Sequence, residues 1–314
     1  MKTFAFGVDI GGTTIKMGLF TTLGGILDAW EIPTQTESKG SHILPDIAEA
    51  IEKRLAEHDI SKLDVEGIGV GVPGPVGTDG TVFKCVNLGW GVFNVERRLS
   101  SITGLKVKAG NDANVAALGE MWQGGGKGYE NIVMVTLGTG VGGGVIIGGK
   151  ILAGANGAAG EIGHFPMFDD ETEDCACGKK GCLEQYTSAN GIVRITKRYL
   201  AAHPQVESSL KLIERYTAKE IFDEAKKGDA VALLMVDEVG KLLGKGLASI
   251  ACVLNPDVFV IGGGMAKAGE MLLESVRKHF RTYAFHASRE TQFRIAELSN
   301  DAGIYGGVRM VLEL

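Results

Sequence analysis

Two glycine-rich turns, each between two apolar strands, constrain the fold of this chain more than any other feature. Residues 4–9 (FAFGVD) are expected to form a buried strand, with IGGTT as the turn and IKMGLF as a second strand. The same order returns in 131–147, as NIVMVTL, GTGVGGG and VII. A hairpin that recurs about 130 residues later predicts an internally duplicated α/β architecture.

The first of these turns has the composition of a phosphate loop. Backbone N–H groups of glycines can approach phosphate oxygens with no Cβ in the way. Asp9 closes the preceding strand, and Thr13, Thr14 and Lys16 add hydroxyls and a positive charge. An ordinary hairpin with a Gly-Gly turn explains the same residues, so the turn alone leaves both interpretations open.

Three further matches to nucleotide motifs fail on their context. Gly69–Gly74 and Gly138–Gly143 both fit G-x-G-x-x-G, but a dinucleotide fold needs a helix directly after the glycines. The first is followed by prolines and the second by a strand. Gly144–Lys150 fits the start of a P-loop, but Ile151 stands where the magnesium-binding hydroxyl is required.

A cysteine cluster predicts a structural zinc site. Cys175, Cys177 and Cys182 have the spacing C-x-C-x4-C, and His164 lies upstream. Three thiolates and one imidazole are a complete tetrahedral set for zinc, whereas three cysteines so close together are a poor disulfide pattern. Four protein ligands leave no position for water, so this zinc is expected to shape the fold rather than to perform hydrolysis.

Polar residues follow two predicted strands. Residues 105–109 are a short strand leading into NDAN (111–114) and a helix. Asn111 or Asp112 fits the helix N-cap, but capping needs only one of them, and in open α/β sheets ligands bind beyond strand C-termini. The strand 65–72 ends at Pro73-Gly74-Pro75, where the backbone could reach a ligand or form a rigid loop. NLGW (87–90) fits a sugar-facing loop or core packing of its tryptophan equally well.

The rest of the chain alternates helices and strands. Thr217 and Glu220 form a capping box for a helix to about 227, and Asn255-Pro256 ends a long apolar helix. The segment VFVIGGG reads as a strand followed by three glycines. The remaining expected elements are helices at 43–58, 229–254, 267–281 and from 302 onward, and an edge strand at 293–298.

Composition excludes several classes of protein. The chain has 314 residues and a net charge of −6, with no run of Lys or Arg, so neither a nucleic-acid nor a membrane surface is expected. No signal peptide or membrane span is visible. Cys85 and Cys252 lie in apolar contexts and are expected to be core thiols in a reducing cytosol. The expected location is therefore cytoplasmic.

The motifs together resemble the ROK family of sugar kinases and related repressors, over essentially the whole chain. The similar segments are LGTGVGGGVIIGGKILAGANGAAGEIGHFP, CACGKKGCLEQYTS, DIGGTT, NDAN and the glycines 262–264. The resemblance implies an actin/hexokinase-like, ribonuclease H-like duplicated α/β fold with two lobes and a cleft between them. We expect a small domain at 1–110, with a C-terminal helix at about 300–314 packing back on it. A large domain at 111–299 would carry the zinc site.

The resemblance also implies residue roles. Asp112 would be the general base that takes the proton from the sugar's primary hydroxyl, and His164 would bind both zinc and sugar. The residues implied to bind the sugar, with Gly74 added from its turn, are Gly74, Asn111, Asp112, Glu161, His164 and Glu184. Those implied to bind magnesium-ATP are Asp9, Gly11, Gly12, Thr13, Thr14, Lys16, Gly138, Thr139, Gly140, Gly262, Gly263 and Gly264.

The expected function is ATP-dependent phosphorylation of the glucose 6-hydroxyl, since NLGW is similar to the segment in ROK glucokinases. Mannose, fructose, allose or N-acetylmannosamine as acceptor, and polyphosphate as donor, remain alternatives. A sugar-responsive repressor would need a helix-turn-helix domain before the first phosphate loop, where only eight residues precede Asp9. The family further implies a homodimer.

Overall fold

The computed structural model describes residues 2–313, and the chain divides into two compact units. Unit 1 comprises the residues up to 132, 144–160 and those from 297 onward. Unit 2 comprises 133–143 and 161–296. Across 2–313, no helix combines the length and the apolar character needed to cross a lipid bilayer.

Unit 1 is built on a five-stranded sheet of order β3-β2-β1-β4-β7. Strands β1 and β2 are antiparallel, as are β2 and β3, whereas β1, β4 and β7 run parallel. The parallel strands therefore end at one edge, where Asp9 pairs with Gly71 and Gly71 with Gly110. The strands are β1 (Phe4–Ile10), β2 (Thr14–Thr21), β3 (Ile26–Pro33), β4 (Val65–Val72) and β7 (Val107–Asn111).

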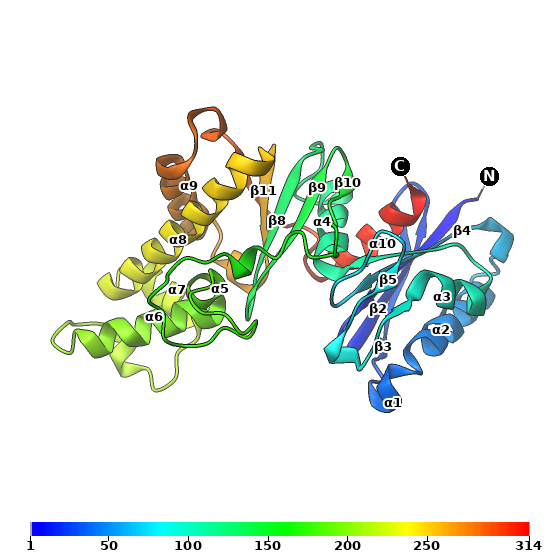
Figure 1. The fold of residues 1–314 in the computed structure, drawn as a ribbon, viewed down its shortest axis with the longest axis horizontal. Coiled ribbons are helices and arrows are strands. Elements are labelled where there is room, and N and C mark those ends of the chain that lie inside the picture. The colour runs from blue at the N-terminus through cyan, green and yellow to red at the C-terminus, as the bar shows by residue number, and fades with distance from the viewer. Residues whose placement is uncertain (1, 314) are drawn as a thin grey trace. The chain divides into compact units, whose positions relative to one another are not determined.

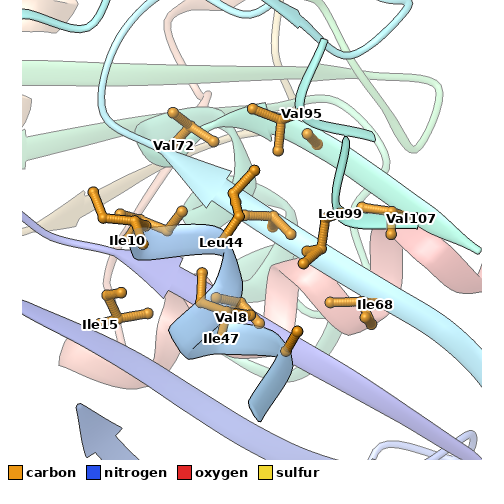
Figure 2. Close-up of a cluster of buried hydrophobic side chains, with 14 of the residues drawn as sticks. Val8, Ile10, Ile15, Leu44, Ile47, Ile68, Val72, Val95, Leu99 and Val107 are labelled. Atoms are coloured by element: carbon orange, nitrogen blue, oxygen red, sulfur yellow. The ribbon is translucent and has the colours of Figure 1, made fainter. Parts of the chain in front are cut away.

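Helices α2 (Ile43–Glu57) and α3 (Val95–Thr103) cover one face of this sheet. Alternate residues of β1 point to that face, because successive strand side chains point to opposite sides. Figure 2 shows this cluster, in which Val8 and Ile10 of the sheet meet Leu44 and Ile47 of α2. Trp90 of the NLGW segment belongs to this core and donates a hydrogen bond from Nε1 to the Gly40 carbonyl at 3.1 Å.

Helix α10 (Ala302–Leu312) packs on the opposite face, beside α4 (Asp112–Gln123), and is drawn in red in Figure 1. It lies unusually close to the strands. A Cβ on Gly7 would stand 1.9 Å from the Ile304 carbonyl oxygen, and one on Gly69 would stand 1.8 Å from that of Gly307. Glycine at these strand positions thus lets the helix backbone rest directly on the sheet.

A second five-stranded sheet repeats this architecture. The second sheet has the order β10-β9-β8-β11-β12, so each strand takes the place of its counterpart in the first sheet. The predicted duplicated α/β fold is therefore confirmed. The strands are β8 (Ile132–Leu137), β9 (Val141–Ile147), β10 (Lys150–Ile151), β11 (Val258–Gly262) and β12 (Gln292–Ile295).

Three helices of unit 2, α7, α8 and α9, follow their predicted signals, whereas α5 and α6 were not predicted. Thr217 and Glu220 form the predicted capping box at the start of α7, and α8 ends at Asn255, which adopts a left-handed conformation. These helices are α5 (Glu184–Thr187), α6 (Ala189–Ala202), α7 (Ala218–Lys226), α8 (Ala230–Leu254) and α9 (Glu270–Tyr283). The smaller elements of unit 1 are α1 (Glu37–Gly40), β5 (Thr81–Val82) and β6 (Phe93–Asn94).

Several predictions differ from the structure. The glycines of VGGG lie inside β9 rather than in the turn. Gly144 is needed there for close packing, because a Cβ on it would stand 2.5 Å from the Ala113 carbonyl oxygen. Cys252 is exposed rather than buried. The predicted boundary after residue 110 also differs from the observed division, because α4 packs against α10 and β4 within unit 1.

Candidate active site and metal cluster

The β1–β2 turn is a closed loop with an open outer side. The Gly11 N–H donates to the Thr14 carbonyl at 2.9 Å. Thr34, directly after β3, clamps the turn: its hydroxyl donates to the Gly11 carbonyl at 2.7 Å and its N–H to the Thr13 carbonyl at 2.9 Å. No heavy atom lies within 4 Å of the place where a Gly12 Cβ would stand. The turn is thus held rigid while one side stays accessible to a ligand.

Asp9 carries a partly buried carboxyl group beside this turn. Burial, and secondly the negative charge of Asp112, raise the pKa of Asp9 to about 6, while Lys16 opposes the shift. Lys16 itself forms an ion pair with Asp301, just before α10. A Cβ on Gly303 would stand 2.5 Å from the Asp9 carboxyl carbon, so the first turn of α10 packs directly against the carboxyl group.

The structure assigns the helix cap of α4 to Asn111. Its Oδ1 accepts the Asn114 N–H at 3.1 Å, and its Nδ2 donates to the Gly74 carbonyl at 3.1 Å and to Asp112 Oδ1 at 3.0 Å. The Ala113 N–H also donates to Asp112 Oδ1, at 2.8 Å. These two donors orient the Asp112 carboxylate at the end of β7, and Asn111 ties it to the loop after β4.

His164, Cys175, Cys177 and Cys182 form one cluster in unit 2. One ligand atom from each residue lies within 4.8 Å of all the others. The Cys177 and Cys182 sulfurs are 3.6 Å apart, far beyond the disulfide bond length of about 2.05 Å. The Cys175 sulfur lies 3.7 Å from His164 Nδ1. The predicted ligand set is therefore assembled.

These separations fit zinc. Bonds of about 2.3 Å to sulfur and 2.0 Å to nitrogen, arranged tetrahedrally, hold the ligand atoms roughly 3.5–3.8 Å apart. His164 would offer Nδ1 to the metal, since its Nε2 faces Glu161 Oε2 at 3.8 Å. The histidine thus presents its two ring nitrogens to different partners.

Glu184 links this cluster to the β8–β9 turn, a connection that sequence reasoning did not find. Glu184 Oε1 accepts a hydrogen bond from the Cys175 thiol at 2.9 Å, and Oε2 accepts the Val141 N–H at 3.4 Å. The turn itself is closed by a hydrogen bond from the Gly138 N–H to the Gly140 carbonyl at 3.0 Å. Because α5 begins at Glu184, one carboxylate connects the turn, the helix and the thiols.

The Gly262–Gly264 segment lies at the end of β11. Gly263 has φ +83° and ψ 179°, a backbone conformation essentially restricted to glycine. A Cβ there would also stand 2.5 Å from the Leu137 carbonyl oxygen. The segment therefore packs tightly against the end of β8, next to the turn at 138–140.

Two buried carboxylates support these segments and were missed from the sequence. Hydrogen bonds from Arg198, at 2.9 Å to each oxygen, hold the pKa of Glu171 far below its usual range despite burial. They fix the loop that leads to the cysteines onto α6. Glu120 is fully buried and accepts backbone N–H groups of Gly125, Glu297 and Leu298 at 2.8–3.0 Å. Only tertiary structure reveals such partners.

Comparison with known proteins gives consistent matches over the whole chain. The model of the ROK family matches residues 5–313. A glucokinase of Halalkalibacterium halodurans is 47% identical over 305 residues, covering 96% of this chain and 92% of that protein. A ROK family glucokinase from Streptomyces griseus, solved with glucose and AMPPNP, is 34% identical with a TM-score of 0.72, covering 97% and 98% of the two chains. A ROK hexokinase from Thermus thermophilus is 31% identical with a TM-score of 0.78, covering 99% and 98%.

Proposed function

The chain belongs to the ROK family, and from that membership we propose that it is a glucokinase, transferring the γ-phosphoryl group of ATP to the 6-hydroxyl of glucose. The observation that carries this proposal is the Asp112 carboxylate, oriented by two hydrogen bonds at the end of a parallel strand. Ligands of open α/β sheets bind beyond such strand ends. The identity to a glucokinase over nearly the full length supports glucose as the acceptor.

Asp112 is the proposed general base. Its carboxylate takes the proton of the 6-hydroxyl while that oxygen forms a bond to the γ-phosphorus and the bond from the γ-phosphorus to the ADP oxygen breaks. A positioned base of this kind contributes about 10²–10⁴-fold to the rate. The hydrogen bonds from Asn111 and the Ala113 N–H fix the direction in which the carboxylate accepts that proton.

The glycine turns are proposed to hold the nucleotide. Phosphoryl transfer depends mainly on positioning and on neutralising charge, and N–H and O–H donors of a rigid turn do both. Magnesium, when bound, neutralises the phosphate oxygens, and Asp9 is the proposed outer-sphere partner. The proposed ATP-binding residues are Gly11, Gly12, Thr13, Thr14 and Lys16 in unit 1, and Gly138, Thr139, Gly140, Gly262, Gly263 and Gly264 in unit 2.

The sugar hydroxyls are proposed to meet polar groups without a lysine or arginine, which favours a neutral ring over an acidic sugar. Gly74 and Asn111 are already joined by a hydrogen bond in unit 1. In unit 2, His164 Nδ1 faces the thiols and Nε2 faces Glu161, which supports simultaneous zinc and sugar binding by this imidazole. Glu184 is the remaining proposed contact.

The proposed zinc is structural. With Cys175, Cys177, Cys182 and His164 as ligands, its coordination is complete. It closes the loop that carries His164 and Glu184 and so positions two proposed sugar contacts. No step of the reaction passes through it.

The test is a coupled ADP-release assay with glucose, mannose, fructose and N-acetylmannosamine at identical ATP and magnesium concentrations. We expect the highest kcat/KM for glucose, because a site that hydrogen-bonds each hydroxyl penalises an epimer that leaves one partner unpaired. A higher value for another of these sugars would reject glucose as substrate but retain a hexose kinase. Absence of ADP release with all four would reject the kinase proposal for these acceptors.

A further inference from the structure

A separate cavity of ≈ 530 Å³ lies within unit 1, along the outer edge of β7. Strand β7 is the last of its sheet, so this side of it has no neighbouring strand. The walls come from α4, α10, the β9–β10 hairpin and the loop after β4. Leu118, Ile151 and Met310 supply apolar surface. A volume in this range suits a small organic molecule rather than a few waters.

Three cationic side chains line this cavity: Lys108, Lys150 and Arg309. Lys108 has a partner, since its Nζ lies 3.6 Å from Glu313 Oε1. Within 2–313, Arg309 and Lys150 form no ion pair with a carboxylate. Burial lowers the pKa of Arg309, and no neighbouring acidic group offsets that effect. A half-buried guanidinium without a counter-charge is costly unless an anion comes to it.

The carboxylates nearby are already engaged. Glu96 Oε1 accepts the Ala109 N–H of the β7 edge at 2.9 Å. Glu313 serves both Lys106, at 3.3 Å, and Lys108. The lining therefore carries three cations against two acids that have other partners, in a chain whose net charge is −6. The lining thus carries a small excess of positive charge, opposite in sign to the net charge of the protein.

We infer that this cavity is a binding site for a small anionic molecule, with a phosphate or carboxylate group on Arg309 and Lys150 and an apolar or ring-shaped body against Leu118, Ile151 and Met310. Arginine pairs with either group through two parallel N–H donors. The site differs from the proposed nucleotide loops, which lie at the β1–β2 and β8–β9 turns, and it shares one residue, Asn111, with the proposed sugar contacts.

The position of the cavity connects it to Asp112. Its lining includes Gly110 and Asn111, the last residues of β7, and Asn114 in the first turn of α4. Asp112 stands between them. An occupant would therefore touch the strand–helix junction that orients the proposed base. The binding claim itself does not depend on the proposed reaction, because it is tested without turnover.

Phenyl phosphate is a suitable probe, because it joins an oxyanion to a flat apolar body of small volume. Isothermal titration calorimetry of the full chain, without ATP or sugar, should give a dissociation constant in the millimolar range or tighter. Arg309→Met and Lys150→Met should each weaken binding at least about tenfold through loss of charge-assisted hydrogen bonds. Lys245→Met removes a charge from the exposed surface of α8 and should leave the constant unchanged.

Benzoate and benzyl alcohol complete the experiment. Tighter binding of phenyl phosphate than benzoate identifies phosphate as the preferred group, and the reverse order identifies carboxylate; either supports the site. Benzyl alcohol, which lacks the charge, should bind at least about tenfold more weakly than the better anion. Three results would each overturn the inference. Benzyl alcohol could bind as tightly as the better anion, or the folded Arg309→Met and Lys150→Met proteins could bind with an unchanged dissociation constant. The third is no detectable heat of binding up to about 10 mM of either anion.

Discussion

The two glycine turns occupy the same place in two equivalent sheets, yet they carry different chemistry. In unit 1 the strand before the turn ends in Asp9-Ile10, and in unit 2 the equivalent residues are Thr136-Leu137. The partly buried carboxyl of Asp9 has no counterpart at Thr136. Duplication has therefore kept the backbone loop, which supplies N–H donors, while the acidic function stays in one copy.

The edge strands extend this contrast. Strand β7 runs into Asn111 and Asp112, which cap and begin α4, whereas β12 runs into Ala296, whose N–H donates to the Ile261 carbonyl at 2.9 Å. Unit 2 gathers its reactive groups elsewhere, in the thiol and imidazole cluster. Under the proposed function, the first copy would supply the base for proton transfer and the second would hold a structural metal.

The largest expected effect comes from replacing the proposed base, Asp112, in unit 1. Asp112→Asn keeps the shape of the side chain but removes its basicity, so kcat for glucose phosphorylation should fall at least about 10²-fold with a modest change in KM. Asp59→Asn is the matched control, because Asp59 is exposed and has φ +53°, a conformation that asparagine tolerates. Near-normal turnover of a folded Asp112→Asn protein would reject Asp112 as the general base.

Cys177→Ser tests the proposed zinc site of unit 2. The variant should lose stoichiometric zinc and at least about 4 kcal/mol of stability, since binding energy of a structural metal is folding energy. Metal analysis and calorimetry of freshly purified, reduced protein provide the measurement. Cys252→Ser changes an exposed thiol outside the cluster and should alter neither quantity. Zinc-free wild-type protein would contradict the metal assignment.

A glycine pair in unit 2 sharpens the comparison of the loops. Gly263→Ala should cost about 3 kcal/mol, because alanine strongly disfavours this backbone conformation and its methyl group meets the Leu137 backbone. The neighbouring Gly264→Ala meets no heavy atom within 4 Å and should cost far less. Urea unfolding of both variants decides the matter. Equal losses would show that the close approach to β8 is unimportant.

Asp9 gives an expected effect that depends on pH. Its pKa of about 6 lies above the ordinary value of 3.8, so the folded protein binds this proton more tightly than the unfolded chain. The ionised group therefore destabilises the fold above pH 6, by up to about 3 kcal/mol, and the penalty vanishes below about pH 4.

Asp9→Asn removes that penalty. Without magnesium and nucleotide, the variant should be more stable than wild type at pH 7.5, and the difference should shrink as the pH falls from 6 to 4. Urea midpoints across this range measure it, with Asp59→Asn showing no such trend. A difference independent of pH would contradict the raised pKa.

Local signals explain which elements were predictable. The capping box at Thr217, the apolar run of α8 and the strand–turn–strand hairpins each lie within one short segment, so the sequence displays them directly. Helix α6 was missed, although Ser188 caps it, because its segment IVRIT is rich in β-branched residues that favour strands. Strand β3 was missed because none of its residues is fully buried.

The candidate site was predictable in composition but not in its connections. NDAN indicated a ligand-binding strand end, and the cysteine spacing indicated a metal cluster that the structure assembles. The contact of Glu184 with Val141 and the packing of Gly303 on Asp9 join residues that no local pattern relates. Such pairs depend on how the strands are ordered in the sheet.

The return of α10 to the first sheet also sets an order of events during synthesis. Unit 2 has all its residues once the ribosome has passed Ala296, whereas unit 1 still lacks the helix that carries Ile304, Val308 and Val311, each fully buried. Translation adds about 5–20 residues per second, and domains generally fold as units. The part of the chain made first is therefore completed last, and a nascent chain stalled before residue 302 would lack the helix that packs on β1 and β4 beside α4.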